Sequence, residues 1–474
     1  MKDKPKWSDL PAPGREIAAP ESAQETPETE ISHLNKSQFL PVLKNAEFML
    51  FSISQSVSLF GDKLDYMALL AMIAFFSGKY GWESARAISF LSAIIALPTI
   101  LFGPLAGILV DRWDRRKVMV VCDSARTLLV LAIPLLALAT SNLTLVYALA
   151  FLVFLCGLFF QTARLSIIPN LVGTDRLLGA NSFMNFIGRI ATFAGVLLGG
   201  LIVDWSWWRH IGINPVWSAG FYFDSLSYLV SVVALLIIFS RLKSTWGGVN
   251  GRGQKPAEVK MFIDQQARML HEVREAWQLV ARGPTVLFVY ASIFVMVILG
   301  AAVFVLYVPI IQGGRELAHA SGLGLGTRGV GFIAAVGSVG LVLSSMTYGI
   351  IGHRVKKHVV MVVCFLVLGL AASAMALLKS FVLALPLAFL AGLALSPIYI
   401  GMDTLLHESV PEEARGRIFS VREWLLHLTF AVSSLVIGQL THFFPNRHLL
   451  FVVGLFVVAA SGLGFMFTRR RAIA

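Results

Sequence analysis

From residue 87 to residue 139 the chain reads AISFLSAIIALPTILFGPLAGILVDRWDRRKVMVVCDSARTLLVLAIPLLALA. Two apolar runs, 87–110 and 118–139, lie on either side of the short charged segment Asp111–Lys117. A helix of roughly 20 residues is long enough to cross the hydrocarbon of a bilayer, and in lipid a helix satisfies its own backbone hydrogen bonds. The stretch therefore predicts two membrane-spanning helices joined by a charged loop.

The same alternation of apolar runs and short polar segments continues along the whole chain. Hydrophobic residues make up 57% of its 474 residues and charged residues 14%, whereas charged residues are roughly a quarter of an ordinary soluble protein. We therefore expect an all-α integral membrane protein with twelve transmembrane helices. Their expected positions are 45–76, 87–110, 118–139, 143–168, 178–203, 216–239, 286–311, 330–351, 359–378, 381–406, 418–443 and 449–467.

A long polar break between the sixth and seventh spans predicts the division of the chain. We expect a disordered cytoplasmic tail at 1–40, a first six-helix bundle at 41–240, a cytoplasmic linker at 241–283 and a second six-helix bundle at 284–474. The tail is rich in Pro, Glu, Ser and Ala, without the apolar core of a secretory signal.

Within the linker, apolar residues recur at helical spacing, which predicts an amphipathic helix on the inner membrane surface. These residues are Phe262, Leu270, Val273, Trp277 and Val280. A plain linker helix is the preferred interpretation, and a regulatory or partner-binding role is the alternative.

Lysine and arginine gather in alternate loops, which predicts the orientation of the chain. The richer side includes Arg112–Lys117, Arg354–Lys357 and Arg469–Arg471. Both termini are therefore expected in the cytoplasm. The formal net charge of +12 is then a topology signal rather than a nucleic-acid-binding surface.

The three cysteines, Cys122, Cys156 and Cys364, all fall inside expected spans. Their positions show no close metal-ligand spacing and indicate neither a zinc site nor a disulfide framework. We interpret them as inert packing residues.

The segment Gly107-Ile-Leu-Val-Asp111-Arg112-Trp-Asp114-Arg115-Arg116-Lys117 resembles the signature loop of the major facilitator superfamily, with Asp114 where that loop usually has Gly. Two further segments, 163–182 and 408–420, resemble the bacterial efflux branch that contains the enterobactin and macrolide exporters. The resemblance covers roughly residues 40–470. It implies two pseudo-symmetric six-helix bundles, a carrier that needs no cofactor and works as a monomer, and export from the cell.

The signature loop predicts a cytoplasmic gate between the bundles. Gly107 would permit close approach of two helices, Asp111 would accept a charge-assisted hydrogen bond, and the cations would bind helix ends or lipid phosphates. Arg164 is the expected partner of Asp111. The alternative for the cations is a plain positive-inside role. The expected gate residues are Gly107, Asp111, Arg112, Arg115, Arg116, Asp123, Arg126, Arg164, Asp403 and Arg417.

The fifth span carries Gly188, Gly195, Gly199 and Gly200. These positions resemble the glycine-rich motif of family antiporters, although Val196 stands where that motif has Pro.

Ionisable side chains inside a span are costly and mark functional positions. The expected proton-coupling or substrate residues are Asp62, Asp65, Arg189 and Asp224. Arg189 is the cation expected to face an acid of the first span, and Asp224 is placed toward the outer mouth. A structural ion pair is the alternative role for Asp62. Asp123 and Arg126, three residues apart, are expected to pair with each other or with the gate.

Asp403 and His407 share a helical face, but no second pair of ligands accompanies them, so we expect a polar cluster rather than a metal site. The expected members of that cluster are Glu408, Arg422 and Glu423. The second half also presents an apolar wall suited to an amphipathic or aromatic substrate, for which core packing is the alternative. The wall residues are Phe288, Tyr290, Phe294, Phe304 and Tyr307.

These features predict a secondary active transporter in the cytoplasmic (inner) membrane. It would export a small amphipathic molecule, a drug-like compound or a siderophore, by alternating access and proton antiport. The alternatives are a lysophospholipid transporter and, from another class, a non-transporting membrane receptor or scaffold. The sequence shows no nucleophile paired with a base, which a membrane enzyme would need. It also shows no ATP-binding motif, which an ATP-driven pump would need.

Overall fold

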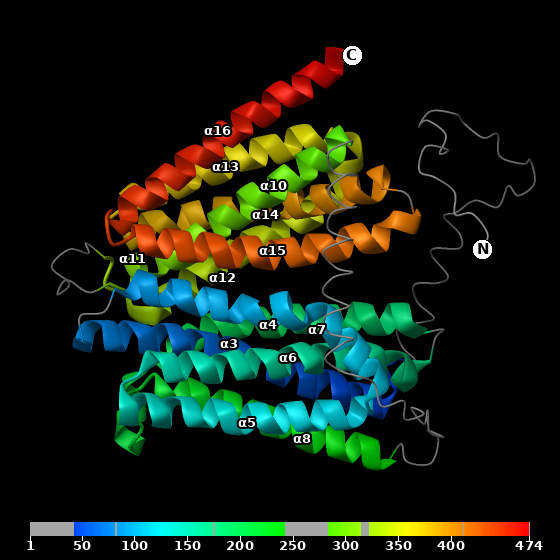
Figure 1. The fold of residues 1–474 in the computed structure, drawn as a ribbon, viewed down its shortest axis with the longest axis vertical. Helices are drawn as coiled ribbons and strands as arrows, with labels where there is room; N and C mark the ends of the chain where they lie inside the picture. The colour runs from blue at the N-terminus through cyan, green and yellow to red at the C-terminus, as the bar shows by residue number, and fades with distance from the viewer. Residues whose placement is uncertain are drawn as a thin grey trace, which may run out of the picture.

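The structure is a computed structural model that describes residues 42–80, 83–173, 176–241, 283–313, 322–410 and 412–473. Within these ranges the regular structure is helical, and the helices form two bundles stacked along the long axis of the molecule (Figure 1). The expected disordered tail and the expected amphipathic linker helix lie outside the described residues.

The first bundle contains six long helices. They are α3 (Ala46–Tyr80), α4 (Ser84–Arg112), α5 (Arg115–Thr140), α6 (Leu143–Val172), α7 (Leu177–Val203) and α8 (Ser218–Arg241), with a short 3-10 helix, η3 (Ser206–Ile211), before α8.

The second bundle repeats this plan. Its first span is formed by α10 (Pro284–Ala302), the π-helix η5 (Val303–Tyr307) and α11 (Val308–Gln312) in succession. The others are α12 (Gly326–Ile351), α13 (Lys357–Leu377), α14 (Phe381–Ser409), α15 (Glu412–Leu440) and α16 (Asn446–Ile473), with η6 (Gly352–Arg354) after α12.

Eleven of the described helical segments are long and apolar enough to cross a membrane. The twelfth, α3, is the longest at 35 residues, but Asp62, Lys63 and Asp65 interrupt its apolar sequence. The prediction of an all-α membrane protein with two six-helix bundles is confirmed. Most predicted boundaries are short by a few residues, because the helices continue past the apolar runs into the polar ends.

The charged loop between α4 and α5 shows how a polar segment ends one helix and begins the next. Trp113 is in an extended conformation after α4, and the Asp114 carboxylate accepts a hydrogen bond from the Arg116 backbone N–H at 3.0 Å. This bond satisfies a donor that the first turn of a helix leaves free. Asp114, where related loops usually have Gly, therefore caps α5.

The two ends of the bundles differ in composition, and we name them accordingly. The basic end carries Arg112–Lys117 and Arg354–Lys357, and the tryptophan end carries Trp205, Trp207 and Trp208 of η3. In Figure 1 the tryptophan end lies to the left and the basic end to the right. Because the helices alternate in direction, α3, α5 and α7 all run from the basic end to the tryptophan end.

The bundles meet mainly through two helix pairs, α4 with α15 and α7 with α12, with smaller contacts of α3 with α12 and of α4 with η5. Near the tryptophan end a Cβ added to Gly200 would lie 2.8 Å from the Thr327 carbonyl oxygen, so α7 and α12 touch backbone to backbone. Farther along α7, Gly195 instead faces Lys63 of α3, and farther along α12, Gly340 faces Phe389 of α14. The two bundles are therefore in close contact at the tryptophan end, where the molecule is closed.

Candidate functional site

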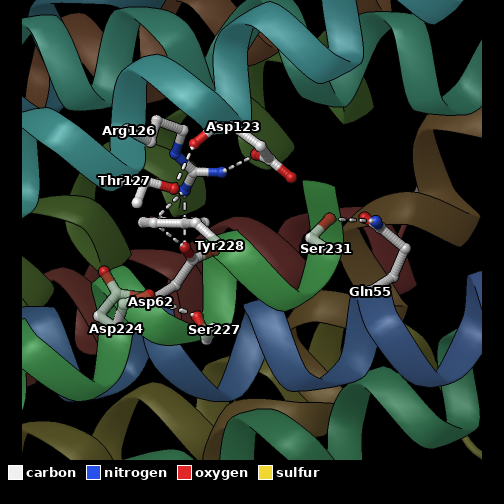
Figure 2. A network of polar contacts seen from close by, with 9 residues as sticks. All are labelled: Gln55, Asp62, Asp123, Arg126, Thr127, Asp224, Ser227, Tyr228 and Ser231. Atoms are coloured by element: carbon white, nitrogen blue, oxygen red, sulfur yellow. Dashed lines mark hydrogen bonds and ion pairs between the residues drawn. The ribbon is translucent and has the colours of Figure 1, made fainter. Parts of the chain in front are cut away.

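Charged side chains from three helices of the first bundle meet at bilayer depth (Figure 2). Gly61 makes this possible, because a Cβ there would lie 2.3 Å from Asp224 Oδ1 and 2.0 Å from Ser227 Oγ. About one and two turns farther along α3, the Leu64 carbonyl and Ala68 face Gly220 in the same way. Small residues on both helices thus bring α3 and α8 close enough for their polar groups to interact.

The Arg126 guanidinium lies at the centre of this network. Its Nη2 donates to Asp62 Oδ1 at 2.6 Å and to the Tyr228 hydroxyl, and its Nη1 donates to Asp123 Oδ1 at 3.3 Å. The Tyr228 hydroxyl also donates to Asp62 Oδ1 at 2.5 Å. The guanidinium lies 3.9 Å from the centroid of the Tyr228 ring, so the ring both stacks on the cation and bridges it to the acid.

The surroundings of the network differ from one acid to the next. The Asp62 side chain is 26% exposed, whereas Asp123 and Asp224 are fully buried and Asp65 is 4% exposed. Among the described residues, Asp65 Oδ1, Asp123 Oδ2 and Asp224 Oδ2 have no hydrogen-bond partner. Burying carboxylate oxygens without partners in a membrane interior costs free energy, so binding of a proton or another positive charge would stabilise this cluster.

The register of α3 against α8 places Asp65 toward Asp224. Gly61 faces Asp224 and Ala68 faces Gly220, so Asp65, which lies between Gly61 and Ala68, falls in the same contact region. Ser227 donates a hydrogen bond to Asp224 Oδ1 at 3.1 Å, which leaves the other oxygen of Asp224 free. Two carboxyl groups are therefore enclosed behind the more accessible Asp62.

The structure corrects two expectations for these charges. Arg126, and not Arg189, contacts Asp62, because α5 packs beside α8 while Arg189 is exposed on α7. Asp224 is fully buried against α3 and does not lie at a solvated mouth. The expected pairing of Asp123 with Arg126 is confirmed. Lys63, which follows Asp62 in the sequence, has its Cβ and Cγ packed beside Gly195 of α7.

The signature loop makes contacts different from those expected. Asp111 pairs with Arg115 at 3.0 Å, and Arg115 also donates to the Ser166 carbonyl at 3.1 Å. Arg164 is not the partner of Asp111, whose ion pair is with Arg115. A Cβ added to Gly107 would meet nothing within 4 Å, so the expected close approach is absent there.

The remaining cations of this loop lie at the surface of the first bundle. Arg112 is exposed in the last turn of α4, and the Arg116 guanidinium lies 5.8 Å from the centroid of the Phe239 ring in α8. Their expected role in a gate stays a prediction.

At the basic end of the second bundle, Arg422 forms ion pairs with Asp403 and with Glu423, the latter at 3.3 Å. Lys357 forms an ion pair with Glu408, and the His407 ring lies 4.7 Å from the Phe419 ring. The described residues contain no group of three His, Cys, Asp or Glu side chains that could hold a metal ion. The side chain of Arg417 lies outside the described residues.

The expected aromatic wall is divided between two places. Tyr290 is buried in the second bundle, where its hydroxyl donates to the Ile418 carbonyl at 3.1 Å. Phe304, in the π-helix η5, instead stacks on Tyr66 of the first bundle at 5.4 Å. Phe430 of α15 lies 6.2 Å from Phe304. The rings that meet between the bundles are therefore Tyr66, Phe304 and Phe430.

Two features of the interior were not expected from the sequence. Tyr228 bridges Asp62 and Arg126, a role signalled only by its position one turn after Asp224 on α8. Asp204, at the end of α7, accepts a hydrogen bond from the backbone of Arg328 in the other bundle. The only sequence signal for Asp204 is an acid between an apolar run and a tryptophan-rich segment.

Comparisons with known proteins agree with this architecture. The family model of the Major Facilitator Superfamily matches residues 51–327 and 317–473. The putative bacilysin exporter BacE of Bacillus subtilis is 26% identical over 404 residues, which are 83% of this chain and 88% of that protein. The macrolide efflux protein A of Streptococcus pyogenes is 24% identical over 392 residues, which are 80% of this chain and 85% of that protein.

Solved structures show the same fold. A bacterial homologue of the human lysosomal transporter Spinster, in an inward-facing and unoccupied conformation, aligns with a TM-score of 0.64 and 14% identity over 90% of this chain and 98% of that one. A bacterial homologue of the iron transporter ferroportin, in an inward-facing state, aligns with a TM-score of 0.62 and 15% identity over 89% and 98%.

Proposed function

The chain belongs to the major facilitator superfamily, and from that premise we propose that it exports a small amphipathic molecule by proton-coupled alternating access. It is a multi-pass membrane transporter with a small-molecule substrate and not an enzyme. The direction, the driving ion and the substrate class are the proposal. Relatives named as a bacilysin exporter and a macrolide efflux protein support export of a drug-like compound. A siderophore is proposed from the resemblance of residues 163–182 and 408–420 to the exporter branch described above.

The proposed orientation follows from the distribution of charge. Arg112–Lys117 and Arg354–Lys357 lie together at the basic end, and positively charged loops face the cytoplasm in most membrane proteins. With that end inside the cell and both termini there, the conformation described above, closed at its tryptophan end, corresponds to an inward-facing state. We propose the cytoplasmic membrane as its location and the monomer as its working form.

The observation that carries proton coupling is the enclosure of Asp65 and Asp224. Each has a carboxylate oxygen without a hydrogen-bond partner among the described residues, and both lie in the contact between α3 and α8. Two adjacent negative charges at this depth repel each other and lose their hydration, so we propose that the pair holds a proton.

Asp62, which is partly exposed and bound to Arg126, is the proposed route by which that proton exchanges with the space between the bundles. Movement of Arg126 away from Asp62 would leave the acids without their cation and favour proton uptake. Return of Arg126 would favour proton release. The network can thus be protonated or deprotonated, and a change in the conformation of the carrier shifts the balance between these two forms.

The test is substrate-dependent proton movement in proteoliposomes, measured with drug-like compounds, siderophores and lysophospholipids in turn. We expect Asp65→Asn and Asp224→Asn to abolish coupled proton movement while the protein still folds, because the amide keeps the shape of the carboxyl group without its titration. Glu47→Gln is the matched control, since Glu47 lies in the first turn of the same helix, at the basic end.

The possible outcomes separate the proposals. Substrate movement that is unchanged in both variants would show that the buried acids are structural. Movement of lysophospholipids alone would replace the proposed substrate class. Absence of movement with every class would favour a receptor or scaffold.

A further inference from the structure

Asp204 follows the last residue of α7 at the tryptophan end, where the two bundles touch. Its Oδ2 accepts a hydrogen bond from the Arg328 backbone N–H at 2.7 Å, and Thr327 is the residue before Arg328. Arg328 and Thr327 lie in the first turn of α12, in the other bundle. A side chain of one bundle therefore caps a helix of the other.

The need for such a cap follows from helix geometry. The first four N–H groups of an α-helix lack partners within the helix, and the same end carries a partial positive charge. Leu325, the residue before α12, provides no side-chain cap. Asp204 supplies the acceptor that this helix end otherwise lacks.

The backbone around the contact is shaped to admit the carboxylate. Gly326 has a φ of +63°, and a Cβ at that position would lie 2.5 Å from Asp204 Oδ2. Two more glycines lie beside it. A Cβ added to Gly200 would lie 2.8 Å from the Thr327 carbonyl oxygen, and a Cβ added to Gly331 would lie 2.9 Å from the Val196 carbonyl oxygen. Small residues bring the two helices together, and Asp204 holds the edge of that contact.

We propose that Asp204 is a positioning residue for transport, a latch that holds the tryptophan end closed by capping α12 across the bundles. The proposal rests on the alternating access proposed above. When the tryptophan end opens, the Arg328 N–H group exchanges its hydrogen bond to Asp204 for one to water. The strength of the latch then sets how often the carrier opens at that end.

The test is a distance measurement between spin labels on the full-length protein in lipid nanodiscs, without substrate or proton gradient. Labels on Ala139→Cys and Lys379→Cys report the tryptophan end, because both positions are exposed there and belong to different bundles. The native cysteines Cys122, Cys156 and Cys364 are replaced by serine in every sample.

We expect Asp204→Ala to lower the closed-to-open ratio on the order of fivefold, because it removes the acceptor of the α12 cap. Asp204→Asn keeps an oxygen that can accept the Arg328 N–H, so it should stay close to the unmodified protein. Asn142→Ala is the matched control. It removes the cap of α6 at the same end, where Asn142 accepts from the Thr144 N–H at 2.9 Å, but within a single bundle.

Unchanged label distances in Asp204→Ala would overturn the proposal. Equal opening by Asp204→Asn would also overturn it, because the acceptor oxygen would not be what matters. Equal opening by Asn142→Ala would show a general loss of helix stability and likewise overturn it. Because the measurement needs neither substrate nor protons, a failure of proton coupling would leave its result readable.

Discussion

The interiors of the two bundles differ in the kinds of side chain that they enclose. The first bundle encloses Asp62, Asp65, Asp123 and Asp224 around Arg126. The described core of α10, α12 and α13 is apolar, with isolated polar contacts such as that of the Tyr290 hydroxyl with the Ile418 carbonyl. Charges at membrane depth are costly to keep. The groups that can bind protons are therefore concentrated in the first bundle, while the interior of the second bundle is mainly packed apolar side chains.

The largest loss of stability is expected when Arg126 is replaced. Arg126→Met leaves Asp62 and Asp123 without their cation, and removing one partner of a buried ion pair costs about 3–5 kcal/mol. We expect a matching loss in the free energy of unfolding, measured by denaturant titration in detergent. Arg126→Lys should recover part of it, since an ammonium keeps the charge but cannot reproduce the planar fork. A stable Arg126→Met protein would show that the network is dispensable for folding.

Two buried tyrosines, one in each bundle, allow the two interiors to be compared directly, with a smaller expected loss of stability. Tyr228→Phe removes a hydroxyl that bridges Asp62 and Arg126, and a hydrogen bond to a charged group contributes about 1.5–3 kcal/mol. Tyr290→Phe removes a hydroxyl bound to a neutral carbonyl, for which about 1 kcal/mol is typical. We expect Tyr228→Phe to destabilise the protein more and to be the only one of the two to alter coupled proton movement. Equal effects would remove the distinction between the bundles.

The smallest expected effect concerns Asp204, between the two bundles. Burial raises the pKa of the Asp204 carboxyl above its ordinary value, and the N–H groups of Arg328 and Thr327, with the Arg328 charge, offset only part of that rise. A group with a higher pKa in the closed state binds its proton more tightly there. The closed state is therefore favoured as the pH falls through the raised pKa and loses that advantage as the pH rises past it.

The label distances at the tryptophan end should accordingly shift toward the closed state in mild acid. Asp204→Asn, which cannot titrate, should lose that part of the response. A response of the same size in the Asn variant would assign the pH dependence to other groups.

The fold class and nearly every span could be predicted from the sequence, because a long charge-poor run is stable in a membrane as a helix. The sequence also identified most of the charged residues of the interior, since an ionisable residue within a span is visible without coordinates. Asp62, Asp123, Arg126 and Asp224 were all named from their positions alone.

Only the tertiary structure decided which of these residues meet. Arg126 rather than Arg189 contacts Asp62 because α5 packs beside α8, and Gly61 allows Asp224 to be buried against α3 rather than solvated at a mouth. Asp204 caps α12 although 124 positions separate it from Arg328. Helical periodicity fixes which residues share a face of one helix, but the partner of that face depends on the packing of helices far apart in the chain.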